Sequence, residues 1–151
     1  MLTGQELLYV AARPETATER ATLAARRLPV IGLDEVHRDP ARAGGRAAAW
    51  GARFDRLLVH VDVDALSYTA FPIAENVRRG DGLSLAELGA ILRPLLAAPN
   101  WATLTIAEVN PDHAPMAGAI FGAFLEMLER AFAAGGAEAG RGAAGEASGP
   151  P

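Results

Sequence analysis

Cysteine is absent from the 151-residue sequence. A chain without cysteine forms no disulfide bond, no thiolate metal site and no cysteine nucleophile, and this composition is typical of a cytoplasmic protein. Positive charge is not in excess, because the net charge is −4, which argues against nucleic acid or an acidic membrane surface as a partner. There is no run of the roughly 20 apolar residues that a membrane span needs, and the first residues do not resemble a signal peptide.

What the sequence does contain is enough apolar material for one domain, since half of its residues are hydrophobic. Short apolar runs alternate with helix-like segments, which predicts an α/β fold: a parallel sheet with helices on both faces, in three layers. The expected domain covers residues 1–134, and the Gly/Ala/Pro-rich residues 135–151 are expected to form a disordered tail. The expected strands are 6–12, 28–33, 57–64 and 101–109, and the expected helices include 15–27, 84–94 and 116–133.

Two aspartates close the third apolar run, LLVHVDVD, at Asp62 and Asp64. On one strand they would lie on the same side, and the repulsion between them would be relieved by a bound cation, a neighbouring arginine or protonation of one acid. Carboxylate oxygens suit Mg²⁺ or Mn²⁺. Glu108 ends the fourth run, so the three acids are expected to converge at one edge of the sheet. The alternative is that the aspartates serve only as a helix cap and a solvated loop acid.

Two enzyme classes with a D-x-D pattern compete for this site. Phosphatases of the haloacid dehalogenase type place a nucleophilic Asp after an apolar strand, but they usually have Thr or Val where this chain has Leu66, and no partner lysine motif is evident. Glycosyltransferases that use nucleotide sugars hold a metal with D-x-D, yet nothing else in the sequence supports a sugar-nucleotide site.

A longer pattern resembles the second half of the arginase/agmatinase (ureohydrolase) family. The segment HVDVDALSYTAFPIAENVRRGDGLSLAELGAIL is followed by LTIAEVNPDHAP. It contains the D-x-D pair, a loop with Pro72, Gly82-Leu83 opening a helix, and the E-x-N-P sequence of residues 108–111. These elements occur in the family's order, and the resemblance covers roughly residues 6–133.

The resemblance implies a metal-dependent hydrolase of C–N bonds in small, linear, cationic amidines or guanidines, with a binuclear Mn²⁺ centre. Asp62 would be the bridging carboxylate and Asp64 a ligand to one metal, and the metals would activate the attacking water. Glu108 would orient the cationic group of the substrate. His113, in the following turn, is a further candidate for substrate binding, with a solvated loop histidine as the alternative. Members of the family commonly form homo-oligomers.

The chain also departs from the family pattern. The family takes its other metal ligands from an earlier histidine and a D-A-H-x-D motif, and none of His37, His60 and His113 lies in such a motif. His60 is expected to be buried and to face away from the acids. The sequence therefore predicts half of an active site, either in a truncated copy or in a chain whose other half is a separate polypeptide. The alternatives are a non-catalytic subunit or binding protein on the same half-fold, and a D-x-D phosphatase.

Overall fold

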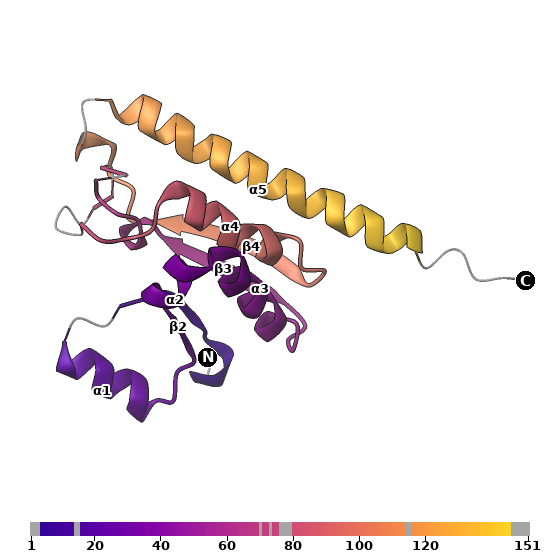
Figure 1. The fold of residues 1–151 in the computed structure, drawn as a ribbon, viewed down its shortest axis with the longest axis horizontal. Coiled ribbons are helices and arrows are strands. Elements are labelled where there is room, and N and C mark those ends of the chain that lie inside the picture. Colours follow the sequence, from indigo (N-terminus) through magenta and orange to yellow (C-terminus); the bar gives the residue numbers. More distant parts are fainter. Residues whose placement is uncertain are drawn as a thin grey trace, which may run out of the picture.

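The computed structural model describes residues 4–13, 16–69, 71–72, 74–75, 80–113 and 116–145 (Figure 1). Side chains are described up to residue 134, except those of Pro111 and Ala117. Pro14, between the expected strand 6–12 and the expected helix 15–27, lies outside the described residues. The strands are β1 (Tyr9–Ala12), β2 (Val30–Gly32), β3 (Leu57–Asp62) and β4 (Trp101–Ala107). The helices are α1 (Ala17–Ala25), α2 (Leu33–Arg38), α3 (Pro40–Gly51), α4 (Leu85–Leu96) and α5 (Ala117–Gly145), and 3-10 turns lie at Gly4–Glu6, Val63–Ala65 and Pro111–His113.

The strands form two parallel pairs. β1 pairs with β2, and β3 pairs with β4. The α/β class with parallel strands and flanking helices is confirmed. The difference from the expected arrangement is that, in the part of the chain that the structure describes, the two pairs are separate sheets and not one continuous sheet.

Strand β3 has one buried and one exposed side. Leu57, Val59 and Val61 are buried, whereas the side chains between them are exposed. His60 is among the exposed ones, so the expectation that it is buried and faces away from the acids is wrong. Side chains two apart on a strand share a face, and His60 therefore lies on the same face as Asp62.

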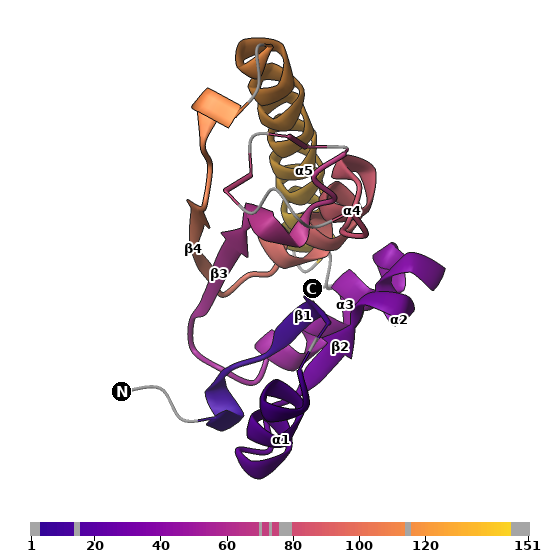
Figure 2. The same ribbon diagram turned by 90° about the vertical axis from the view of Figure 1, so that its left-hand side faces the viewer.

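The buried side of β3 meets a helical layer. Helices α4 and α5 lie on one side of β3 and β4 in Figure 2, and α4 packs between α3 and α5. The core residues of this layer include Leu88, Ile91 and Leu92 of α4 and Phe124 and Leu128 of α5. The face of each helix that carries these residues is the one that packs, whereas Phe121 and Leu125 of α5 are exposed.

The helix ends differ from the expectations in two places. Helix α4 runs through Pro94 and ends at Leu96, two residues beyond the expected end at Pro94. A proline this close to the helix end removes one backbone donor without forcing the last residues out of the helix. Helix α5 continues to Gly145, beyond the expected end near Ala133. Glycine is as frequent as alanine in the added segment, so helix propensity does not account for the extension. Residues 146–151 lie outside the described residues.

The start of α4 is fixed by a capping box that joins it to α2. The hydroxyl of Ser84 accepts from the backbone N–H of Glu87, and Glu87 Oε2 accepts from the Ser84 N–H over 2.7 Å. The other oxygen, Oε1, lies 2.7 Å from His37 Nδ1 at the end of α2. Partial burial opposes ionisation of Glu87, but the hydrogen bonds from His37 and Ser84 and the charge of His37 outweigh it, so its pKa lies below the ordinary value of 4.5.

We predict that Glu87→Gln destabilises the protein at pH 6 by about 1 kcal/mol, because it removes a charge-assisted cap and the link to His37. A carboxyl whose folded pKa is lowered contributes stability that is complete above its unfolded pKa and is lost as pH falls through the folded pKa. The difference in unfolding free energy between wild type and variant should therefore shrink below about pH 4.5. Urea unfolding across pH 3 to 7 measures it.

The matched control is Glu19→Gln, since Glu19 closes the same kind of capping box with Thr16 on α1. Helix α1 contributes no buried residue to the core, so its box should matter less to global unfolding. An equal loss of stability in both variants at every pH would contradict the role given to the His37–Glu87 contact.

Candidate functional site

The acids singled out in the sequence follow the carboxyl ends of two neighbouring parallel strands. Asp62 is the last residue of β3, and its partner in β4 is Ala107, the residue before Glu108. Asp62 and Glu108 are both exposed. The carboxyl edge of a parallel sheet is where ligands bind in open α/β folds, so this edge is the candidate site.

The aspartate pair forms a turn. β3 ends at Asp62, two residues earlier than expected, and Val63–Ala65 forms a 3-10 turn. The backbone N–H of Asp64 donates to Asp62 Oδ1 over 2.9 Å. Val63 between them is fully buried and anchors the turn in the core. Asp62 thus has the capping role that the sequence left open as an alternative, and Asp64 lies in the turn and not on the strand.

Glu108 lies in a strained backbone conformation. Its φ is +64°, in the left-handed region that non-glycine residues rarely adopt. The kink ends β4, and Val109 then forms an antiparallel bridge with Ala74. The N–H of Glu75 donates to the Glu108 carbonyl over 2.9 Å and holds the kink in place. Strain of this kind costs about 1–3 kcal/mol and is found preferentially at functional sites.

A polar network lies beside Glu108, centred on Asn110. The side-chain Nδ2 of Asn110 donates to Glu75 Oε2 over 2.7 Å and lies 3.0 Å from His113 Nε2. The side-chain Oδ1 of Asn110 accepts from the backbone N–H of Asp112. His113 Nδ1 lies 2.9 Å from the Ala74 carbonyl, which only accepts, so Nδ1 carries the proton and Nε2 accepts from Asn110. His113 therefore braces the turn against the loop that carries Glu75.

The sequence did not predict the roles of Asn110 and Glu75. Asn110 was visible as the third residue of the E-x-N-P pattern, but its partners are 35 residues away in Glu75 and three residues away in His113. The other residues of that loop, Ile73 and Asn76 to Arg79, lie outside the described residues.

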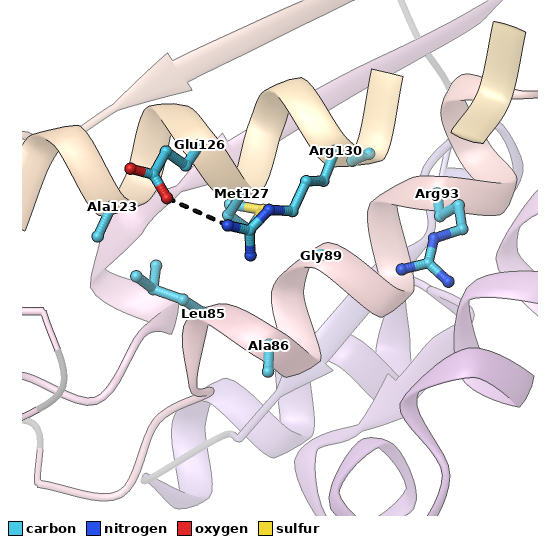
Figure 3. Close-up of a pocket in the computed structure, with 9 residues that line it drawn as sticks. Leu85, Ala86, Gly89, Arg93, Ala123, Glu126, Met127 and Arg130 are labelled. Carbon is cyan, nitrogen blue, oxygen red and sulfur yellow. Dashed lines mark hydrogen bonds and ion pairs between the residues drawn. The ribbon is translucent and has the colours of Figure 1, made fainter. Parts of the chain in front are cut away.

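Two hollows lie elsewhere on the molecule. One, of about 420 Å³, runs between α4 and α5, where Met127 packs over Gly89 and Arg130 binds Glu126 (Figure 3). The other, of about 800 Å³, is lined by residues that include Trp50 and Arg53. Neither is lined by Asp62, Asp64 or Glu108.

The candidate site does not by itself fit a binuclear metal centre. Within the described parts of the chain, no three His, Asp or Glu side chains come together in a group that could hold a metal ion. Asp62 and Asp64 supply hard oxygen donors, the type that Mn²⁺ accepts, but two carboxylates are too few for two metals.

No helix in the described part is long and apolar enough to cross a membrane.

Solved structures of arginases and formimidoylglutamases are similar to this chain. The arginase of Bacillus caldovelox matches with a TM-score of 0.75 and 18% identity, covering 87% of this chain and 44% of that one. The formimidoylglutamase of Bacillus subtilis matches at 0.70 and 19%, covering 85% and 42%. The formiminoglutamase of Trypanosoma cruzi, solved with Mn²⁺, matches at 0.70 and 18%, covering 88% and 45%. No protein-family model and no curated protein sequence matches the chain.

These matches span nearly all of this chain but less than half of each relative. At such low identity they establish the fold, and the resemblance seen in the sequence is confirmed at that level. The chain therefore has the fold of arginases and formimidoylglutamases of the ureohydrolase family, over somewhat less than half of their length.

Proposed function

We propose that this chain supplies part of the active site of a metal-dependent hydrolase that cleaves C–N bonds in linear amidines or guanidines. The observation that carries the proposal is the position of the D-x-D turn and of Glu108 at adjacent strand ends of an arginase-like fold. The same fold argues against a phosphatase, the weaker D-x-D alternative.

The residues of this chain have separate roles in the proposal. Asp62 and Asp64 provide carboxylate oxygens to a metal site whose remaining ligands come from outside the described residues. Glu108 pairs with the planar cationic group of the substrate, because a carboxylate accepts two parallel N–H bonds from a guanidinium. Asn110, Glu75 and His113 hold the turn after Glu108 and so fix the direction in which its carboxylate points. The oligomeric state predicted from the resemblance, a homo-oligomer, is part of the same proposal.

Hydrolysis by the protein isolated from the organism that encodes it tests this function. With Mn²⁺ added, we expect release of urea or ammonia from at least one linear guanidine or amidine. Asp64→Asn should lower the rate by about 100-fold or more, because even the outer-shell partners of metal ligands are worth 10- to 100-fold. Glu108→Gln should chiefly raise KM, because it weakens the pairing with the cation.

The matched control is Asp55→Asn, which changes an exposed aspartate just before the opposite end of β3. It should leave the rate unchanged. Equal activity in the Asp64 and Asp55 variants would refute the role of the D-x-D turn, and hydrolysis of a phosphate monoester that Asp62→Asn abolishes would favour the phosphatase.

A second candidate function is a non-catalytic subunit on the same half-fold. It is favoured by the lack of any three-ligand metal group among the described residues. This candidate predicts no hydrolysis of any guanidine or amidine with or without Mn²⁺, so the same assay separates the two.

A further inference from the structure

In the described residues, the β3–β4 sheet has a face without a helical layer. Leu58 of β3 is 62% exposed and Ile106 of β4 is 39% exposed, and His60 and Thr105 between them are also exposed and lie 2.8 Å apart. In Figure 2 helices α4 and α5 lie on the other side of these strands. We call the surface formed by Leu58, His60, Thr105 and Ile106 the open face.

An open face of this kind is unusual for parallel strands. Parallel sheets are found almost only with both faces covered, whereas antiparallel sheets tolerate one face in water. β3 also pairs with a strand on one edge only, in the part of the chain that the structure describes. An apolar face beside an unpaired strand edge indicates a surface that another polypeptide segment covers.

The fold match indicates what kind of segment that is. Between 42% and 46% of the length of the matched arginases and formimidoylglutamases corresponds to this chain, so more than half of the fold lies beyond it. Among the described residues, Asp62 and Asp64 at the end of β3 are not part of any group of three His, Asp or Glu side chains that could hold a metal ion. One occupant accounts for the uncovered face and for the incomplete metal site. It is an α/β segment that continues the sheet and brings metal ligands to its carboxyl edge.

A second copy of this chain does not meet that need. The sequence has three histidines, and each is already in a contact: His37 with Glu87, His60 with Thr105 and His113 with Ala74. A second copy would add only the same set of side chains. The open face therefore favours a complementary partner over self-association.

We propose that the open face and the free edge of β3 bind a complementary arginase-like α/β polypeptide, which adds parallel strand structure and carries the remaining metal ligands. This inference rests on the proposed function for the identity of the ligands. Assembly and activity are separate measurements, so a complex that forms but hydrolyses nothing refutes the function and leaves the interface standing.

The test is purification of the tagged full chain from the organism that encodes it, with mass spectrometry of what it retains. We expect one polypeptide in near-equal amount, whose sequence aligns with the part of the arginases that this chain does not cover. The Leu58→Asp/Ile106→Asp double variant should retain at least about tenfold less of it, as loss of a central apolar contact does at interfaces. Leu125→Asp is the matched control, since Leu125 is similarly exposed on α5, and it should retain the partner.

Hydrogen exchange gives a second readout that needs no substitution. Amides of β3 should exchange more slowly in the complex than in the isolated chain, because a new strand or layer covers them. Purification of a monomer with nothing bound, of a homodimer through this face, or of a complex that the double variant retains would each overturn the proposal.

Discussion

Gly82→Ala is expected to destabilise the protein by about 3 kcal/mol or more, because the added methyl group has no space. A Cβ at Gly82 would lie 2.5 Å from the Leu66 carbonyl oxygen and nearer still to the Ser67 nitrogen. Both are backbone atoms, which no side-chain rotation moves away. The two segments are joined by a parallel bridge between Leu66 and Leu83 and by hydrogen bonds from the Ser67 and Leu83 N–H groups.

This contact matters for the candidate site because Leu66 follows the turn of Asp62 and Asp64 directly. Spreading the two segments would pull on that turn as well as on the core, in which Leu66 and Leu83 are buried. Gly82→Ala is therefore expected to lower any metal-dependent activity together with stability. Urea unfolding measures the first effect and the guanidine assay the second.

Gly80→Ala is the matched control, two residues away. A Cβ at Gly80 meets no atom within 4 Å, so this variant should differ from wild type by less than about 1 kcal/mol. If Gly82→Ala were as stable as Gly80→Ala, the close contact of Gly82 with the backbone of Leu66 and Ser67 would be contradicted.

Gly44→Ala should destabilise the protein by about 2 kcal/mol, because Gly44 is the contact point between α3 and α4. Its added Cβ would lie 2.7 Å from the Ile91 carbonyl oxygen and 2.8 Å from Ile91 Cα. The two helices would have to separate, and Ile91 is part of the buried core. Thermal unfolding should show the loss as a fall in Tm of several degrees, at about 2–4 °C per kcal/mol.

The neighbouring glycine provides a control with the opposite sign. Gly45 is exposed, and a Cβ there meets nothing within 4 Å. Alanine is the better helix former by roughly 0.5–1 kcal/mol, so Gly45→Ala should raise the stability by about that amount. The packing of α3 on α4 therefore predicts opposite changes in stability from these two adjacent substitutions. Similar effects from both would contradict it.

Local signals in the sequence predicted the elements well. The expected start of a helix at residue 84 agrees with α4, because Ser84 and Glu87 form a capping box whose two halves lie within four residues of the chain. Alternating burial in 57–62 follows from the period of a strand, and the same period places His60 on the face of Asp62. These features depend on neighbours in the chain, which is why the sequence alone defines them.

Features that depend on distant contacts were out of reach. Gly44 approaches Ile91, and Glu75 is joined to Asn110, across more than 30 positions of the chain. The division of the four strands into two separate sheets is likewise not visible in local sequence. The turn at Asp62 was open to two interpretations because D-x-D is equally compatible with a cap and with a metal site. The long ureohydrolase-like pattern was more informative, since its elements are fixed in order.

The most direct test of the central claim is the Mn²⁺ content of the purified chain alone, after equilibration with Mn²⁺ and removal of free metal. Asp62 and Asp64 are proposed to be part of a site that this chain does not complete. We therefore expect little tightly bound metal, with the same low content in the Asp62→Ala/Asp64→Ala variant. About two Mn²⁺ per chain in the wild type, lost in the double variant, would contradict the account, because the chain would then build the whole centre by itself.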